Sequence, residues 1–315
     1  MLHGERITQA IITVPAGFDD APLRATLWAG EEVFGKGHVR LIPEPLAAAI
    51  ASGTRKEQEM VMVVDMGAGT TDIVVGNVIS VGGQYEWLPV TQRCDDELGG
   101  WDMDYQILEQ MLLDDRKPPL LRDLYARLDL RNQGRLMDAI ERAKIAVSTS
   151  GRAQISTVLE DEIDGTPVRK PVIFSLDDAL LRKLVAYPQP RVPADRGSVV
   201  GRCRALVERT LLELADGNPA RLPEAKAHLD RVILVGGPMR MRCLYDMMAE
   251  VFAAQPQVLE RFDPLNTFPM ECVARGAALY RGERVTLQVP HTLSLFNWSK
   301  GGVYQQVLLR NTAQA

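Results

Sequence analysis

The chain has 315 residues, of which 46% are hydrophobic and 24% charged, and its formal net charge is −5 at pH 7. These values are typical of a globular protein with more than one domain or lobe. They exclude binding to nucleic acid or to a membrane surface through charge alone.

The sequence contains neither a signal-like apolar segment at its start nor a stretch long enough to span a membrane. Its four cysteines are widely spaced and form no C-x-x-C pair, which argues against a metal site or a disulfide framework. We therefore expect buried free thiols and a cytoplasmic protein.

The first fifth of the chain alternates between strand and helix signals. Residues 9–14 form a short apolar run closed by Pro15, and residues 18–35 have helical spacing with an aspartate cap and a terminal glycine. A second strand at 39–42 precedes a helix at 46–53. This alternation predicts a layered α/β fold, and the polar residues 54–59 predict a surface link.

Residues 61–78 (VMVVDMGAGTTDIVVGNV) predict a strand, a turn of small residues and a second strand. Gly67 and Gly69 allow a tight turn whose N–H groups come close to an anion such as phosphate. Asp65 has the oxygen ligands that a hydrated Mg²⁺ needs, and Thr70 offers a hydroxyl to a phosphate oxygen. An ordinary β-hairpin with a glycine turn is the alternative.

The middle of the chain predicts a mixture of hairpins and helices. The expected elements are strand signal at 78–90 with a Gly82-Gly83 turn, a helix from Trp101 behind Gly99-Gly100, a helix at 134–150, and a hairpin of 153–159 with 168–174 joined by the acidic turn EDEIDGT.

The remainder begins with a helix from Ser175 that an aspartate can cap, followed by a proline-rich loop at 187–198. The expected elements after it are a helix at 199–215, a strand at 231–235 running into Gly236-Gly237, helices at 242–252 and 269–280, and short β-rich pieces after Arg281. An apolar strand followed directly by a glycine turn is thus predicted twice in the chain.

Taken in order, several motifs resemble the nucleotide-binding domain of the Hsp70 chaperones, within the superfamily of actin, sugar kinases and Hsp70. The stretches that carry the resemblance are IPEPLAAAIASG (42–53), VVDMGAGTTD (63–72), DELGGWDMD (96–104), ERAKIAVSTS (141–150), VILVGGPMR (232–240) and VARGAAL (273–279). The resemblance covers nearly the whole chain in the family's own order.

The resemblance implies an actin-like ATPase fold of the ribonuclease H-like type, with two lobes and a short β-rich tail. The expected division is lobe I at 1–58 and 267–285, lobe IIA at 59–96 and 176–266, lobe IIB at 97–175, and the start of a substrate-binding β domain at 286–315. Because no D-x-G-T-T precedes Ile11, we expect the family's first strands and first phosphate loop to be missing.

The activity implied is binding of ATP and ADP with Mg²⁺, and ATP hydrolysis coupled to binding and release of unfolded polypeptide. A J-domain co-chaperone and a nucleotide-exchange factor are the further partners expected, without nucleic acid or membrane. Hydrolysis by this chain is expected to be weak. A non-catalytic module derived from an Hsp70 is the alternative function, and a small-molecule kinase of the same superfamily is a third.

Carried over by resemblance, the catalytic residues are Glu44 near the γ-phosphate, Asp65 acting through Mg²⁺ and Thr70. Asp72 has a structural role. The residues expected to contact the nucleotide are Gly67, Ala68, Gly69, Thr70, Gly99, Gly100, Glu141, Lys144, Ser148, Gly236, Gly237 and Arg240.

Four of these have specific expected roles. Glu141 and Lys144 resemble a ribose-contacting pair, although a surface ion pair at i and i+3 is an alternative. Arg240 is expected to stack on the adenine. Ser148 is expected to face the edge of the adenine.

The sequence also departs from the family's pattern around the adenosine. Ala68 replaces a glycine, and if this position needs a positive φ, the methyl group costs about 1 kcal/mol. Ile145 stands where the family has a second stacking arginine. Pro238-Met239 and Met270 also replace polar residues. These changes predict weaker binding of adenosine.

Overall fold

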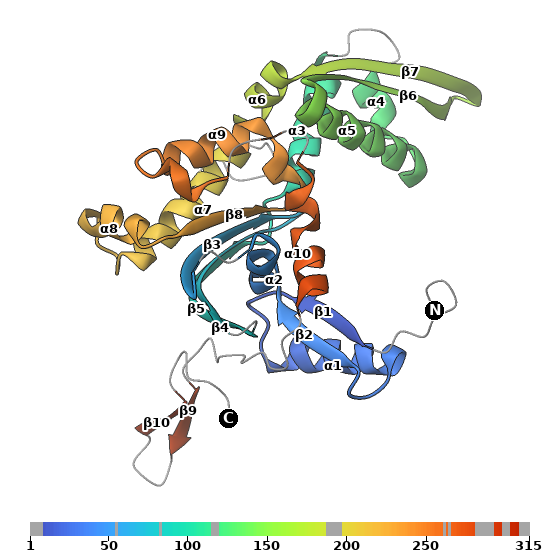
Figure 1. The fold of residues 1–315 in the computed structure, drawn as a ribbon. Helices are drawn as coiled ribbons and strands as arrows, with labels where there is room; N and C mark the ends of the chain where they lie inside the picture. The colour runs from blue at the N-terminus through green and yellow to red at the C-terminus, as the bar shows by residue number, and fades with distance from the viewer. Residues whose placement is uncertain are drawn as a thin grey trace.

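The computed structural model describes residues 9–53, 56–81, 84–114, 120–186, 197–260, 263, 266–280, 293–297 and 303–308. The first four elements alternate between strand and helix, as the sequence predicts for an α/β fold, and runs of strands and of helices follow them (Figure 1). No helix in these ranges is long and apolar enough to cross a membrane.

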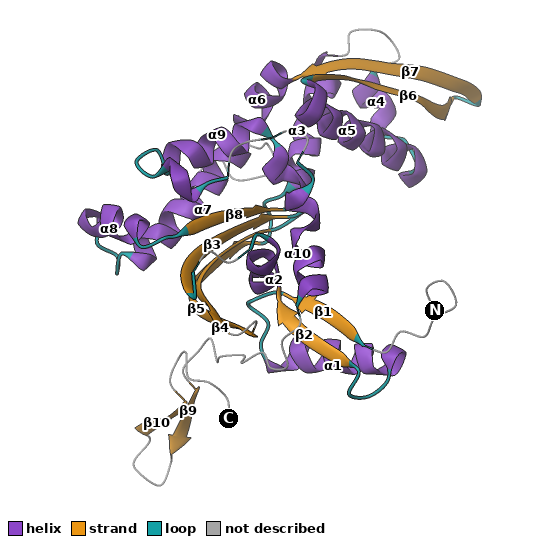
Figure 2. Ribbon diagram, in the orientation of Figure 1, coloured by secondary structure: helices purple, strands orange, loops and turns teal. Residues whose placement is uncertain are grey.

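A four-stranded sheet lies at the centre of the molecule (Figure 2). Its strands, in spatial order, are β5 (Gln84–Asp95), β4 (Thr71–Val81), β3 (Gln58–Met66) and β8 (Arg231–Val235). β3 pairs antiparallel with β4 and parallel with β8, in the register Val61 to Arg231 through Asp65 to Val235. The two strands that end in glycine turns are therefore neighbours, and their turns lie at the same edge of the sheet.

Both faces of this sheet are buried, which explains why β3 is apolar from Met60 to Val64. Met62 and Val64 belong to one hydrophobic cluster, whereas Val61 and Val63 belong to a second one on the opposite face. The helices that cover the first face are α7 (Val199–Leu214) and α9 (Arg242–Val251); those that cover the second are α2 (Glu44–Ala51) and α10 (Phe268–Leu279).

Small residues let α2 and α10 pack closely beside the sheet. A Cβ atom added to Gly276 of α10 would lie 1.7 Å from the carbonyl oxygen of Ala47 in α2. Any side chain at position 276 therefore forces the helices apart. This contact fixes the start of α2, and with it Glu44, relative to the end of β3.

A second group of elements lies between β5 and β8 in the chain and continues the first hydrophobic cluster. These elements are α3 (Gly100–Asp114), α4 (Leu121–Tyr125), α5 (Leu130–Ser150), β6 (Arg152–Ile163), β7 (Thr166–Asp177) and α6 (Asp178–Ala186). Ile155, Leu159, Val172 and Leu176 bury one face of the β6–β7 hairpin, and the residues between them are more exposed. That alternation is typical of an antiparallel pair with one solvated face.

The remaining helices and strands lie near the two ends of the chain, except for α8, which lies between α7 and β8. They are β1 (Ala10–Val14), α1 (Asp20–Phe34), β2 (Val39–Pro43), α8 (Leu222–Ala227), β9 (Leu293–Asn297) and β10 (Val303–Leu308). β1 and β2 pair in parallel, and β9 and β10 pair antiparallel.

Several predicted boundaries differ from the structure for local reasons. Helix α2 begins at Glu44, ahead of the prediction, because Pro45 falls in its first turn, where proline is tolerated. The predicted acidic turn of the hairpin is mostly strand, and the reversal is made by Asp164 and Gly165, which both have positive φ. Helix α6 begins at Asp178 because Asp177 accepts a hydrogen bond from the Leu180 N–H.

Other predictions were incomplete or wrong. Helices α4 and α8 lie in segments without a predicted helix, and α5 begins four residues before the prediction. Cys94 is exposed, so the expectation of four buried thiols is wrong for it. The Gly82-Gly83 turn, most of the proline-rich loop and residues 281–292 lie outside the described residues.

Candidate functional site

The predicted glycine turn joins β3 to β4 and packs against the start of α3. Within the turn, the Gly67 N–H donates to the Thr70 carbonyl at 2.9 Å. The Gly100 N–H donates to the Gly67 carbonyl at 3.0 Å, and the Trp101 N–H to the Ala68 carbonyl at 2.7 Å. The first amides of α3 are therefore bonded to the turn. The amides of residues 68–70 have no partner among the described residues and remain available to an anion.

Two glycines expected to contact the nucleotide have a packing role around this turn. A Cβ atom on Gly99 would lie 2.4 Å from the Ala68 carbonyl oxygen. Gly236 has φ +91°, and a Cβ atom there would lie 1.9 Å from the Met66 carbonyl oxygen. Both positions admit only glycine because the backbone of the turn passes so close.

A cavity of about 280 Å³ lies beside the turn. It is bounded by the turn, the start of α3, one face of α5, the 3-10 turn η3 (Gly237–Arg240) and the start of α10. The residues expected to bind nucleotide that line it are Gly67, Ala68, Gly100, Glu141, Lys144, Ser148, Gly237 and Arg240. Gly69, Thr70, Gly99 and Gly236 do not line it. The structure thus brings together predicted residues from four separate parts of the sequence.

Lys144 is buried beneath this cavity rather than paired with Glu141. Its Nζ donates to the Gly100 carbonyl at 2.9 Å and to Asp104 Oδ2 at 2.8 Å. Burial raises the pKa of Asp104 to about 6, although Lys144 acts in the opposite direction. The alternative of a surface ion pair between Glu141 and Lys144 is therefore not what the structure shows.

Three carboxylates lie on the other side of the turn, around a hollow of about 20 Å³. Asp65 and Asp72 are opposite each other in the β3–β4 register, and Glu44 reaches them from the start of α2. Burial, then Glu44 and Asp72, raise the pKa of Asp65 to about 7. Burial and Asp72 likewise raise the pKa of Glu44.

The charge of this acidic hollow is of the sign that attracts a cation. The residues that line it include no lysine or arginine, so the described chain supplies no positive charge at its wall. No group of three His, Cys, Asp or Glu side chains among the described residues is arranged to hold a metal ion by itself. Mg²⁺ needs only one or two carboxylates and keeps its remaining waters, which agrees with a role for Asp65.

Sequence reasoning missed two residues of these sites. Asp72 was given a structural role, yet its carboxylate lies in the acidic hollow and raises the pKa of Asp65. The hairpin register contains the signal, because a four-residue loop between residues 67 and 70 places Asp72 opposite Asp65. Trp101 lines the cavity, and its sequence position alone marked only the start of a helix.

The departures from the family pattern fall into two groups. Ile145, Pro238 and Met270 line the cavity, whereas Met239 is buried in the hydrophobic core. Among the described non-glycine residues, only Asp164 and Asp216 have positive φ. The backbone of Ala68 therefore has no positive φ, and the energetic cost that a methyl group would carry at a positive φ does not arise there.

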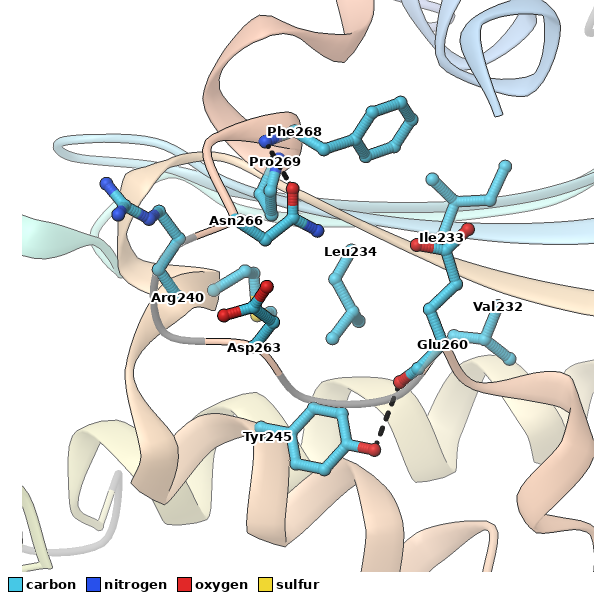
Figure 3. Close-up of a pocket in the computed structure, with 11 residues that line it drawn as sticks. Val232, Ile233, Leu234, Arg240, Tyr245, Glu260, Asp263, Asn266, Phe268 and Pro269 are labelled. Carbon is cyan, nitrogen blue, oxygen red and sulfur yellow. Dashed lines mark hydrogen bonds between the residues drawn. The ribbon is translucent and has the colours of Figure 1, made fainter. Parts of the chain in front are cut away.

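A separate pocket of about 50 Å³ lies under the chain before α10 (Figure 3). Residues Val232 to Leu234 of β8 form its floor, and the Tyr245 hydroxyl donates to the Glu260 carbonyl at 3.0 Å. Arg240 lines both this pocket and the larger cavity. The volume of this separate pocket is far below the roughly 300 Å³ at which ligand pockets begin, whereas the larger cavity, at about 280 Å³, is close to that size. The larger cavity is therefore the candidate site.

Comparison with known proteins connects these features to one family. The family described as Hsp70 protein matches residues 1–183. The chain is 34% identical over 98% of its length to the chaperone protein DnaK of Elusimicrobium minutum, and equally to that of Methanothermobacter thermautotrophicus. A DnaK of Cyanophora paradoxa is 31% identical. The chain spans 46%, 47% and 45% of these relatives, about half their length.

Proposed function

Because the chain belongs to the Hsp70 family, we propose that it binds ATP and ADP in the 280 Å³ cavity beside the β3–β4 turn. The observation that carries this proposal is the convergence of predicted contact residues from the turn, α3, α5 and η3 on one cavity. These segments are far apart in the sequence, so their meeting is a property of the fold. Open amides at the turn supply the complementary phosphate site.

The residues of the chain have separate tasks in this proposal. The amides of residues 68–70 bind the terminal phosphates, and the Thr70 hydroxyl assists them. Asp65 holds Mg²⁺, which neutralises charge on the phosphate oxygens when it is bound. Glu141, Ser148 and Arg240 contact the nucleoside at the walls of the cavity.

Glu44 orients the attacking water in the proposed hydrolysis, from a position fixed by the contact of α2 with α10. We propose that hydrolysis by this chain alone is weak. The acidic hollow has no lysine or arginine among the described residues that line it. Phosphoryl transfer depends chiefly on positioning and on neutralising developing negative charge.

The proposed wider role is that of the nucleotide-binding part of a chaperone that binds and releases unfolded polypeptide. J-domain co-chaperones, nucleotide-exchange factors and a cytoplasmic location belong to the same proposal. So does the division into lobe I, lobe IIA, lobe IIB and the start of a β domain. Family membership and the names of the DnaK relatives support it.

Titration calorimetry of the 315-residue chain with ATP and ADP, with and without Mg²⁺, tests the proposal. We expect binding that is stronger with Mg²⁺, and we expect Asp65→Asn to remove the effect of Mg²⁺ while retaining metal-free binding. Asp20→Asn on the exposed surface of α1 is the matched control. No heat with either nucleotide contradicts the proposal.

A module that binds nucleotide without hydrolysing it is the second candidate. Two observations favour it: the described residues that line the acidic hollow include no lysine or arginine, and residues 145, 238 and 270 of the large cavity are changed. Phosphate release under single-turnover conditions separates the candidates: slow release that Glu44→Gln abolishes supports weak hydrolysis, and binding without release supports the module.

A further inference from the structure

The large cavity has an apolar rim made by three side chains from three different elements. Trp101 of α3, Ile145 of α5 and Met270 of α10 all line it, and they are 60%, 48% and 60% exposed. Single exposed apolar residues are ordinary on a protein surface. Three that meet at the mouth of one cavity form a patch, and such patches mark binding sites.

The indole ring of Trp101 is held next to the turn. Its main-chain N–H donates to the Ala68 carbonyl at 2.7 Å. The Cε3 atom of the ring is the nearest heavy atom to a Cβ built on Gly69, at 3.7 Å. The ring therefore lies beside the turn whose amides are available to phosphate, and it forms part of the cavity wall.

The polar groups of the same cavity are largely engaged with the protein. Lys144 bonds Asp104 and the Gly100 carbonyl. The Ser148 hydroxyl donates to the Lys144 carbonyl at 3.2 Å. Arg240 Nη1 donates to the sulfur of Met270 at 3.2 Å. Lys144 and Ser148 thus direct their donors to protein carbonyl and carboxylate oxygens, and three apolar side chains line the same cavity.

Building on the proposed nucleotide site, we propose that Trp101, Ile145 and Met270 bind the ring system of the nucleotide by stacking and van der Waals contact. Trp101 is the main contact. The site then binds nucleotides that carry a flat aromatic base and discriminates little between adenine and guanine. Stacking tolerates different bases because every base has a π-face.

Calorimetry with three ligands and three variants tests this inference. ATP and GTP are the ligands with a base, and inorganic tripolyphosphate is the ligand without one. The variants are Trp101→Ala, the conservative Trp101→Phe, and Trp28→Ala, which removes a tryptophan of similar exposure on α1 that does not line the cavity.

We expect ATP and GTP to bind the unmodified chain within about threefold of each other. Trp101→Ala should weaken both about tenfold, as loss of one stacking contact does, and leave tripolyphosphate unchanged. Trp101→Phe should recover most of the loss, and Trp28→Ala should change nothing. Matching thermal unfolding curves confirm that each variant is folded.

Two results overturn the inference while leaving the proposed nucleotide site intact: ATP binding that Trp101→Ala does not change, or GTP binding more than about twentyfold weaker than ATP. An equal loss of ATP and tripolyphosphate in Trp101→Ala also overturns it, because the residue then acts through the turn. If the unmodified chain binds none of the three ligands, the proposed function fails, and this inference fails with it.

Discussion

Lys144 Nζ lies 2.8 Å from Asp104 Oδ2, and the two side chains are 8% and 3% exposed. The same nitrogen bonds the carbonyl of Gly100, at the start of α3. The second carboxylate oxygen of Asp104 is buried without a hydrogen-bond partner. The pair therefore ties α5 to the helix whose first amides hold the β3–β4 turn, at the floor of the proposed nucleotide site.

Lys144→Met is expected to lower the free energy of unfolding by about 3–5 kcal/mol, because it leaves the buried carboxylate of Asp104 without its counter-charge. Denaturant unfolding at pH 8, where Asp104 is ionised in the native state, measures this loss. The double variant Lys144→Met with Asp104→Leu should recover most of it, since two apolar groups can replace a buried pair at little cost. Equal stability of Lys144→Met and the unmodified chain is inconsistent with a buried pair.

The central sheet was predictable because its apolar runs and glycine turns are local features of the sequence. Strand β8 was located to the residue, and the hairpin of β3 and β4 followed from one stretch. The partner of Lys144 was not predictable, because Asp104 lies forty positions away and only the packing of α3 on α5 joins them. Helical spacing instead suggested Glu141.

The residues of the candidate site show the same limit. Resemblance to a family predicted eight of the positions that line the large cavity. It did not explain why a particular amino acid stands at each position. Gly99 and Gly236 resembled ligand contacts, and only the close carbonyls of Ala68 and Met66 explain them. The apolar rim likewise required the fold, since the sequence marked Ile145 and Met270 as separate departures and Trp101 only as the start of a helix.

Gly236→Ala is expected to destabilise the protein by about 3 kcal/mol or more, because φ is +91° and a methyl group meets the Met66 carbonyl. Its neighbour provides the matched control: a Cβ atom on Gly237 meets nothing within 4 Å. Gly237→Ala should change the unfolding free energy by less than about 1 kcal/mol. Chemical denaturation compares the two, and similar losses argue against the close approach of η3 to β3.

Ala68→Gly is expected to destabilise the protein slightly, by about 0.5–1 kcal/mol. Ala68 has no positive φ, so glycine relieves no strain and only adds conformational freedom to the unfolded chain. The resemblance to a glycine-containing loop alone predicts the opposite sign. Thermal unfolding of the variant decides between them, and a rise in midpoint shows that the methyl group is strained.

Asp65→Asn is expected to stabilise the metal-free protein at pH 8. The pKa of Asp65 is raised from 3.8 to about 7 in the native state by burial and by Glu44 and Asp72. Between these values the native state holds a proton that the unfolded state has released, so the unfolding free energy falls as pH rises through this window. Because Asp65 is only partly buried, we expect the variant to gain on the order of 2 kcal/mol at pH 8.

The gain should largely disappear near pH 4, where Asp65 is protonated in the native state and close to half protonated in the unfolded chain. Urea unfolding in the presence of a chelator at both values measures it, with Asp20→Asn on the surface of α1 as the control. Added Mg²⁺ should then stabilise the unmodified chain and not the variant, since a bound cation favours the ionised carboxylate. If Asp65→Asn raises the unfolding free energy equally at both pH values, the stabilisation comes from packing. The electrostatic argument for a cation in the acidic hollow then fails.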